Sequence, residues 1–545
     1  MRLELGDAIE TDVLVIGGGG AGLRAAIAAT EAGARALILS DSRVGYGSLT
    51  AVSGGAFAST READWKGHFT DTVVGGRFLG DQELVTVLAT RIDSEARQLA
   101  EYGARYLDQS TTRWLSHVID PGHHAAAMVY GQNAIGTDIT FTLRRRAEAL
   151  GVVFIEGAVA TRLIAEDNNA LGAIALSPKG SVLVVSARAT VLATGGMGQV
   201  YARTDNTPGA TGDGYALAYR AGLALRDMEF MQFYPCALGK GTPGIYYEIL
   251  VSGLNCPLLN NESADIRQIH SLIDPHSTTR DYLSIAIMRE VDAGHGVEGG
   301  AILDLSRIAP EVLEDVAPIM PKAWQRGVTR FPVAPTAHTH LGGVVIDPSG
   351  HTDLEGLYCA GEVCGGVHGA NRLGGNALSE TLVFGSIAGN EAALRAAERP
   401  SSRIHSRHVA DEKDRLEKLS RGGNVDTKAM STRLKNLMWT NAGVLRSEES
   451  LTLALEGIDE LKDSLHSVGA SDGRGLQRLV KLRNSLLSAE FLCRSALVRT
   501  ESRGAHYRTD YPTEDSDWLC STFVRKGPSG PSISTRPVSF PHLRP

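Results

Sequence analysis

The chain has 545 residues, with 54 basic and 62 acidic side chains and a formal net charge of −8. Its 43% hydrophobic and 21% charged content is ordinary for a soluble globular protein, and its length predicts two or three domains. No Lys/Arg tract alternates with aromatic residues, so nucleic acid is excluded as a partner. No apolar run reaches about 18 residues and no signal-peptide pattern is present, so we expect a cytoplasmic protein without a membrane span.

The six cysteines form no C-x-x-C pair. This pattern predicts reduced thiols and no cysteine set for an iron–sulfur cluster. The histidines show no metal-ligand spacing, so we predict no metal site.

The first forty residues predict a nucleotide-binding βαβ unit. Residues 12–16 (DVLVI) are typical of a buried parallel strand, residues 23–31 of a helix, and residues 36–39 of a second strand. Between the first strand and the helix, Gly17, Gly19 and Gly22 form the G-x-G-x-x-G pattern, which brings the backbone close to a pyrophosphate. The second strand ends in Ser40, so Asp41 is the only nearby carboxylate for a ribose hydroxyl.

Later segments return to the same strand-and-glycine pattern at 189–196, 211–214 and 357–362. They predict one nucleotide-binding domain made of residues 1–228 and 345–400, with a second domain, 229–344, inserted between them. Residues 401–500 are charged, with apolar residues at helical spacing, and predict a helical domain. Residues 501–545 form a C-terminal segment, whose Pro-, Ser- and Arg-rich end is expected to be an extended tail.

Several motifs resemble the flavoprotein subunit of succinate dehydrogenase and fumarate reductase, a group that includes L-aspartate oxidase. They are MEFMQF at 228–233, TRD at 279–281, HTHLGG at 338–343, GANRLGGNAL at 369–378 and ESRGAH at 501–506. The motifs follow the family's order from residue 12 to about residue 518. The resemblance implies an α/β fold with a Rossmann-like FAD-binding domain, an inserted α+β capping domain and a C-terminal helical domain.

The resemblance also implies FAD as the cofactor. The implied contacts are Gly17, Gly19, Gly22, Ser40, Asp41, Ser48, Gly54, Gly55, Asp213, Glu362, Asn376, Ala377 and Leu378. Many respiratory members attach FAD covalently to a histidine before the Gly-Gly pair. This chain has Ser48 at that position and no histidine in 48–52, so we expect non-covalent FAD.

The family's reaction passes a hydride between flavin N5 and a carbon next to a carboxylate, while a proton moves on the other carbon. Arg280 matches the family's proton-transferring arginine. His338 and Arg372 match its clamp on one substrate carboxylate, where two cations orient the anion and polarise the double bond.

At the other end of the pocket, the chain departs from the family. Tyr234 stands where the family has a histidine, Tyr247 where it has the threonine of Thr-Glu, and Val251 where it has a relay arginine. A phenol hydroxyl donates a hydrogen bond or a proton to an oxygen but does not pair with a carboxylate as a cation does. We therefore expect a substrate with one carboxylate and a neutral group near Tyr234 and Tyr247, with Tyr234 and Glu248 joining Arg280 in catalysis. The alternative is that the tyrosines only pack.

These observations predict an FAD-dependent oxidoreductase that reduces or forms a C=C bond next to a carboxylate. The alternatives are a fumarate reductase or succinate dehydrogenase flavoprotein, an L-aspartate oxidase, and a non-catalytic flavin-bearing subunit. The electron partner also stays open. Respiratory relatives use an iron–sulfur subunit, which would place the chain on the inner face of a membrane, whereas oxidases use oxygen.

Overall fold

The computed structural model describes residues 2–60, 65–106, 122, 127–130, 135–239, 241, 246–251, 256–274, 278–309, 327–400, 404–423, 426–465, 468–528 and 530–545. Among these residues, no helix is both long and apolar enough to cross a membrane.

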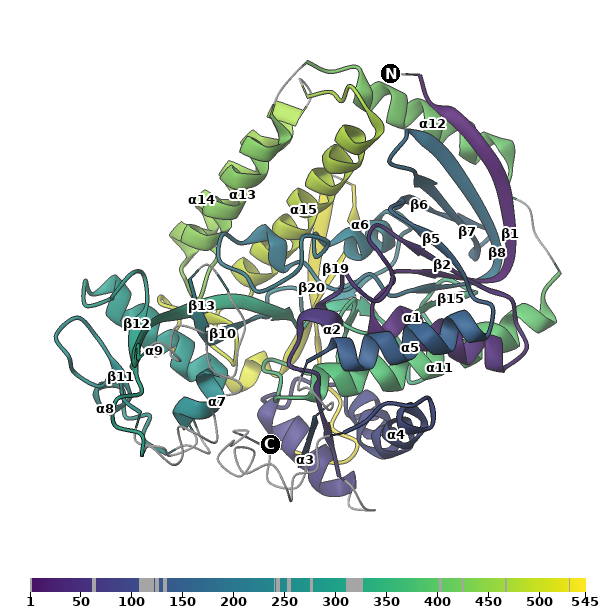
Figure 1. The fold of residues 1–545 in the computed structure, drawn as a ribbon. Helices are drawn as coiled ribbons and strands as arrows, with labels where there is room; N and C mark the ends of the chain where they lie inside the picture. Colours follow the sequence, from purple (N-terminus) through teal and green to yellow (C-terminus); the bar gives the residue numbers. More distant parts are fainter. Residues whose placement is uncertain are drawn as a thin grey trace.

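A seven-stranded sheet lies at the upper right of the molecule in Figure 1. The predicted strand 12–16 is the end of a longer strand, whose residues 13–16 are buried and pair with parallel neighbours on both sides. Strands buried on both faces require continuous β-branched and leucine side chains, which explains the DVLVI run. The strand order is β5 (Val153–Glu156), β2 (Ala36–Ser40), β1 (Glu4–Ile16), β8 (Ser181–Leu192), β7 (Asn169–Leu176) and β6 (Val159–Glu166), with β15 (Leu357–Cys359) also paired to β8.

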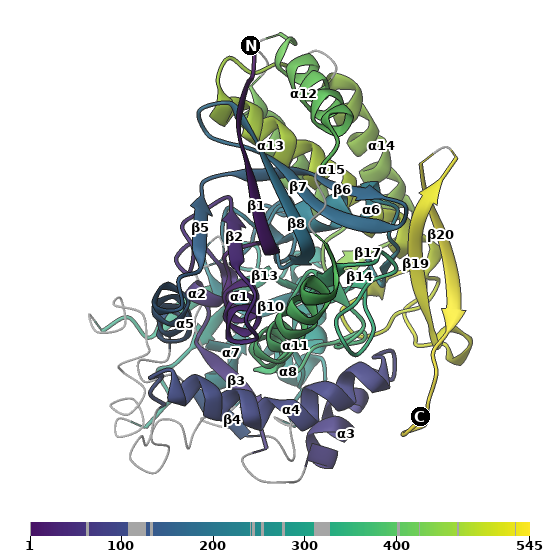
Figure 2. The same cartoon turned by 90° about the vertical axis from the view of Figure 1, so that its right-hand side faces the viewer.

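Three helices lie side by side next to the parallel strands: α1 (Gly20–Glu31), α5 (Thr137–Ala149) and α11 (Asn376–Glu398) (Figures 1 and 2). Helices α1 and α11 approach closely because α11 carries glycine at the contact. A Cβ atom on Gly389 would lie only 2.1 Å from the carbonyl oxygen of Ala25. Helix α11, which follows residue 345 in the chain, thus packs against the N-terminal βαβ unit.

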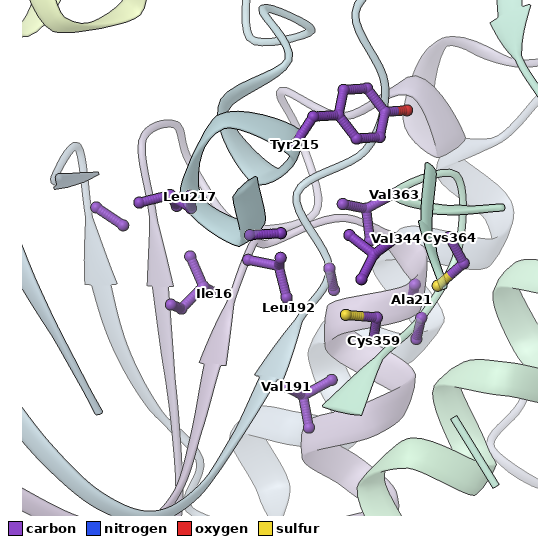
Figure 3. Packing of buried hydrophobic residues seen from close by; sticks show 14 of the residues in the cluster. Ile16, Ala21, Val191, Leu192, Tyr215, Leu217, Val344, Cys359, Val363 and Cys364 are labelled. Atoms are coloured by element: carbon purple, nitrogen blue, oxygen red, sulfur yellow. The ribbon is translucent and has the colours of Figure 1, made fainter. Parts of the chain in front are cut away.

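The apolar core at the strand ends is shown in Figure 3. Ile16 and Leu192 end neighbouring strands and are buried there with Leu217 of α6 (Asp213–Arg220). Cys359 and Val363 are also fully buried in this core. This packing fixes the loops that follow the strands.

Residues 231–340 build a separate four-stranded antiparallel sheet at one side of the molecule (Figure 1). It has its own apolar core, in which Leu283 and Ile287 are fully buried with Leu303. Its elements are β10 (Met231–Leu238), α7 (Tyr246–Val251), β11 (Leu258–Leu259), α8 (Ile266–Ile269), α9 (Arg280–Asp292), β12 (Ala301–Asp304) and β13 (Arg330–His340). This sheet and its helices form an α+β unit.

A smaller group of elements lies between α1 and α5 along the chain. It consists of α2 (Leu49–Val52), β3 (Ala56–Ser59), α3 (Trp65–Gly75), α4 (Gln82–Glu101) and β4 (Ala127–Tyr130), with β3 and β4 paired antiparallel. Helices α3 and α4 lie below α11 in Figures 1 and 2.

The predicted helical region contains α12 (Ser406–Ser420), α13 (Thr427–Asn441), α14 (Glu448–Ser464) and α15 (Gly473–Val498). Two short strands, β17 (Leu445–Arg446) and β18 (Tyr507–Arg508), pair beside it. Helix α15 is largely buried, and the other three helices pack on or beside it (Figure 1). The numerical domain boundaries stay predictions.

The expectation of an extended C-terminal tail is wrong. Strands β19 (Cys520–Gly527) and β20 (Gly530–Pro537) form a hairpin in a sheet with β9 (Leu225–Arg226), β14 (Gly343–Val345) and β16 (Cys364–Gly365) (Figure 2). Buried Phe523 and Val524 anchor the hairpin on β9. Near the end of the chain, the Gln82 side chain donates to the carbonyl oxygen of Leu543 and accepts from its N–H. The sequence does not predict the hairpin because β20 is an edge strand whose side chains are mostly exposed. Backbone hydrogen bonds hold such a strand, so its sequence shows no alternation of apolar and polar residues.

Candidate functional site

A cavity of about 580 Å³ lies where the parallel strands end. Its lining includes the residues that directly follow β1, β2, β8 and β15, at 17–21, 41–42, 193–196 and 360–362. Ligands of parallel sheets bind at the carboxyl ends of the strands, so this is the expected place for a nucleotide. The cavity also reaches Tyr234, Glu248, Arg280 and His338, which belong to the four-stranded sheet and its helices.

The glycine turn is shaped for close approach of a ligand. Gly17 has φ +118°, and a Cβ atom there would lie 2.1 Å from the carbonyl oxygen of Ala193. A Cβ atom on Gly22 would lie 1.9 Å from the carbonyl oxygen of Gly17, so this glycine lets α1 begin directly against the turn. Backbone N–H groups and the helix N-terminus are thereby brought to the cavity wall, an arrangement suited to a pyrophosphate.

Ten of the thirteen predicted cofactor residues line this cavity. They are Gly17, Gly19, Ser40, Asp41, Ser48, Gly54, Asp213, Glu362, Ala377 and Leu378.

The other three, Gly22, Gly55 and Asn376, support the wall from behind. Gly55, at φ +63°, lets the chain pass the carbonyl of Ile135. Asn376 is fully buried, and its amide donates to Thr72 Oγ1 while its oxygen lies 2.8 Å from His68 Nε2.

Glu362 brings an unusual carboxyl group to the cavity. Its Oε1 accepts a hydrogen bond of 2.8 Å from the backbone N–H of His340. Burial nevertheless raises the pKa of Glu362 to about 8, because the charged form loses its hydration there. At neutral pH this side chain is mostly a protonated acid, which both donates and accepts hydrogen bonds.

At the far end of the cavity, Glu248 joins two predicted catalytic residues. Arg280 donates from Nη2 to Glu248 Oε1 at 3.0 Å, and Tyr234 donates from its hydroxyl to Glu248 Oε2 at 2.7 Å. The Arg280 guanidinium also lies 5.9 Å from the ring centre of Tyr234. Arg280 begins helix α9, so its backbone position is fixed by the core of the four-stranded unit.

The two tyrosine hydroxyls donate to groups of the protein. The Tyr234 hydroxyl has a single proton, which goes to Glu248, and its oxygen also accepts the backbone N–H of Tyr247 at 3.1 Å. The Tyr247 hydroxyl donates to the carbonyl oxygen of Thr278 at 2.6 Å, and Tyr247 does not line the cavity. Each of these phenol protons is thus bonded to a group of the protein, while Tyr234 lines the cavity, and the roles of both tyrosines toward the substrate stay predictions.

The predicted carboxylate clamp has supporting residues of its own. His338 Nδ1 lies 2.6 Å from Asp205 Oδ2, and Asn206 donates both to Asp205 Oδ1 and to the carbonyl of His338. Arg372 is buried and donates from Nε to Gln232 Oε1 at 3.2 Å. His338, Asp205 and Arg372 all line the cavity, so the clamp and Arg280 face one space.

Comparison with known proteins identifies the family. A family model described as "FAD binding domain" matches residues 12–378, and one described as "Fumarate reductase flavoprotein C-term" matches residues 431–545. The chain belongs to the fumarate reductase and succinate dehydrogenase flavoprotein family. It is therefore an FAD-dependent oxidoreductase, as the motifs predict, and the residues lining the cavity fit FAD.

Individual members of this flavoprotein family match over nearly their whole length. The chain is 36% identical to one subunit of the fumarate reductase (CoM/CoB) of Methanothermobacter marburgensis, covering 95% of this chain and 97% of that one. It is 34% identical to L-aspartate oxidase of Streptomyces coelicolor, covering 96% and 93%. A solved chain of E. coli quinol fumarate reductase superposes with a TM-score of 0.90 at 26% identity, covering 99% and 98%.

Sequence reasoning on this flavoprotein missed three supporting residues. Asp205, Gln232 and Lys481 each hold a predicted site residue, respectively His338, Arg372 and Asp41. Gln232 lies inside the MEFMQF motif, which was the one available signal for it. Asp205 and Lys481 lie in no motif that the sequence singles out, because their importance comes from contacts distant in sequence.

Proposed function

We propose that this flavoprotein transfers two hydrogens across a carbon–carbon bond next to the carboxylate of a small organic acid. The observation that carries the proposal is the shared cavity of Arg280, His338 and Arg372, with Glu248 bonded to Arg280. Two arginines and a histidine around one space favour an anionic ligand, and the motifs that contain them resemble those of the family.

Bound FAD supplies the hydride chemistry. The residues of the chain bind, orient and protonate the substrate. His338 and Arg372 hold the carboxylate, and their positive charge draws electrons out of the conjugated double bond.

Arg280 moves the proton at the second carbon. An arginine holds its proton tightly in water, so this role needs a neighbour that resupplies the proton as it leaves. Glu248 is that neighbour: its carboxylate bridges Arg280 and the Tyr234 hydroxyl, takes up a proton from solvent and passes it to the arginine that has protonated the substrate. Burial, followed by the charge of Glu248, raises the pKa of Tyr234 well above its ordinary value, so the phenol stays protonated and orients Glu248.

We propose further that the substrate carries one carboxylate. Among the described residues that line the cavity, the cationic groups are Arg280, Arg372 and, when protonated, His338. The clamp uses two of them and proton transfer uses the third. Next to Arg280 the wall is the ring of Tyr234, which suits an uncharged or aromatic group.

A dicarboxylate such as fumarate is the second candidate. The name of the relative from Methanothermobacter marburgensis, at 36% identity, favours it. The name of the Streptomyces coelicolor relative favours L-aspartate. Both require a further carboxylate partner near Tyr234. A non-catalytic role is not favoured, because it does not require the contact between Arg280 and Glu248.

The same comparison supports a proposal for the electron partner. The Methanothermobacter marburgensis relative is named as one subunit of an enzyme, which favours a second chain that carries electrons to or from the flavin, for which an iron–sulfur protein is the proposal. Direct reoxidation by oxygen is the alternative. We also propose that FAD is held without a covalent bond, because Ser48 lines the cavity and supplies no imidazole.

The reaction class is tested with the holoprotein under anaerobic conditions. The flavin is reduced and then mixed separately with crotonate, cinnamate and fumarate, while the flavin absorbance is followed and the acids are analysed by mass spectrometry. We expect at least one unsaturated acid to reoxidise the flavin and yield its saturated acid in equal amount. Reoxidation by oxygen alone would contradict the proposed reaction.

A further inference from the structure

A lysine from the helical region lies behind one side of the FAD cavity. Lys481 of α15 forms a short ion pair with Asp41, the residue directly after β2. Its Nζ also lies 3.8 Å from Oδ2 of Asp213, the first residue of α6. Asp41 and Asp213 both line the cavity, whereas Lys481 lies behind them with its side chain 18% exposed.

The same face of α15 holds the loop that carries Asp213. Asn484 donates to Asp213 Oδ1 at 2.6 Å, and the Ser485 and Ser488 hydroxyls donate to the carbonyls of Thr211 and Gly212 at 3.0 and 3.1 Å. Residues 481, 484, 485 and 488 follow helical spacing, so all four project from one side of the helix. Helix α15 therefore forms an outer wall of the cofactor site.

Charge explains why a lysine is needed at this place. Burial raises the pKa of Asp213, because its charged form is poorly hydrated. Burial alone would lower the pKa of Lys481, but the carboxylates of Asp213 and Asp41 outweigh it and raise the pKa. One ammonium group thus compensates two carboxylates that would otherwise repel each other beside the cavity.

We propose that Lys481 is a positioning residue for FAD, which holds the carboxylates of Asp41 and Asp213 as hydrogen-bond acceptors for hydroxyl groups of the cofactor. Lys481 acts through these two side chains and need not touch FAD. The helical region thereby contributes to cofactor retention, although the sequence assigns FAD binding to 1–228 and 345–400.

The test measures how tightly the full-length holoprotein keeps FAD. Free flavin fluorescence after dilution gives the release rate and the dissociation constant, and thermal unfolding is followed in parallel. We expect Lys481→Met to raise the dissociation constant about tenfold or more, since two partly buried carboxylates lose their cation. Lys481→Arg keeps the charge and is expected to stay within about threefold of the parent.

Lys462→Met is the matched control. Lys462 of α14 forms a 2.6 Å ion pair with Glu490 of α15, the helix that also carries Lys481. Neither Lys462 nor Glu490 lines the cavity. We expect this variant to lower the unfolding temperature by a similar amount but to change FAD affinity less than about twofold. Equal FAD affinity in the two methionine variants would overturn the proposal, because the bridge would then be only structural.

A double variant tests whether Lys481 acts through Asp41. In Asp41→Asn/Lys481→Met, one of the two carboxylates is removed together with the lysine. We expect Lys481→Met to weaken FAD binding less in the Asp41→Asn background than in the parent, because the two residues act together. Strictly additive losses of affinity would overturn the proposal.

Discussion

The hydroxyl of Tyr234 lies 2.7 Å from Oε2 of Glu248 and donates its only proton to that carboxylate. The other carboxylate oxygen accepts from Arg280, so the tyrosine acts on the site through Glu248. Under the proposed function, the phenol orients the carboxylate that serves Arg280.

Replacing Tyr234 by Phe removes one hydrogen bond to Glu248 and leaves the ring in place. A hydrogen bond to a charged group is worth about 1.5–3 kcal/mol, but Glu248 keeps its bond to Arg280. We expect turnover to fall by no more than about tenfold, with FAD fully bound.

Glu248→Gln is the matching variant, because it keeps the shape and removes the charge. We expect it to lower turnover by at least about a hundredfold, since Arg280 loses its proton supply. Steady-state rates with the best unsaturated acid measure both variants. A larger loss in Tyr234→Phe than in Glu248→Gln would show that the hydroxyl acts directly on the substrate.

Replacing Arg280 by Lys keeps a positive charge but loses the planar guanidinium that donates to Glu248 and that we propose reaches the substrate. Proton transfer by a positioned side chain contributes about 10²–10⁴-fold, and we expect turnover to fall by that amount. Ligand-induced changes in the flavin spectrum should persist. The control is Arg267→Lys, whose side chain pairs with Asp265 away from the cavity and whose loss should leave turnover nearly unchanged.

Replacing Asp205 by Ala removes the partner of His338 Nδ1. With Nδ1 bonded to Asp205, Nε2 is the imidazole nitrogen left for the substrate carboxylate, so the aspartate fixes the ring for binding. We expect KM for the unsaturated acid to rise about tenfold and kcat to change less than about threefold. In a His338→Gln background the same change should add nothing, and an undiminished effect there would contradict a role through His338.

Glu362 makes the stability of the FAD-free protein depend on pH. Its pKa is about 8 in the folded chain, against an ordinary value of 4.5. Between these pH values the unfolded chain releases this proton and the folded chain keeps it, so stability falls as pH rises, by up to about 1.4 kcal/mol per pH unit. Below about pH 4.5 both states are protonated and the effect vanishes.

Glu362→Gln should remove this fall in folding stability with rising pH. Urea unfolding from about pH 5 to about pH 8 is expected to show the variant gaining on the parent by a few kcal/mol across the range. Glu398→Gln, at an exposed position of α11, is the control and should follow the parent. If the difference in free energy of unfolding between Glu362→Gln and the parent is the same at every pH, Glu362 titrates normally and the prediction is wrong.

Much of the fold is predictable because the cofactor site depends on local patterns. The apolar run 12–16, the glycine turn and the Ala-rich helix each reflect a backbone requirement within a few residues. The later strand 357–359 was predicted for the same reason and pairs with β8.

The contacts around the substrate end were harder to predict. The Tyr234 hydroxyl is bonded by residues 13 and 14 positions away, on a helix whose orientation depends on the packing of the four-stranded unit. Asp205 and His338 are separated by 133 residues, so only the folded chain brings them together. Sequence patterns identify which residue types are present, but the direction of each hydroxyl proton depends on these distant partners.

The most direct test of the one-carboxylate proposal compares two substrates on the same reduced holoprotein. The second-order rate constants of flavin reoxidation are measured anaerobically with crotonate and with fumarate, which differ in the second carboxylate. We predict that crotonate reacts at least about tenfold faster, because the described site leaves no cation for a second carboxylate. Equal or faster reaction with fumarate would contradict this account and assign the protein to the dicarboxylate reductases.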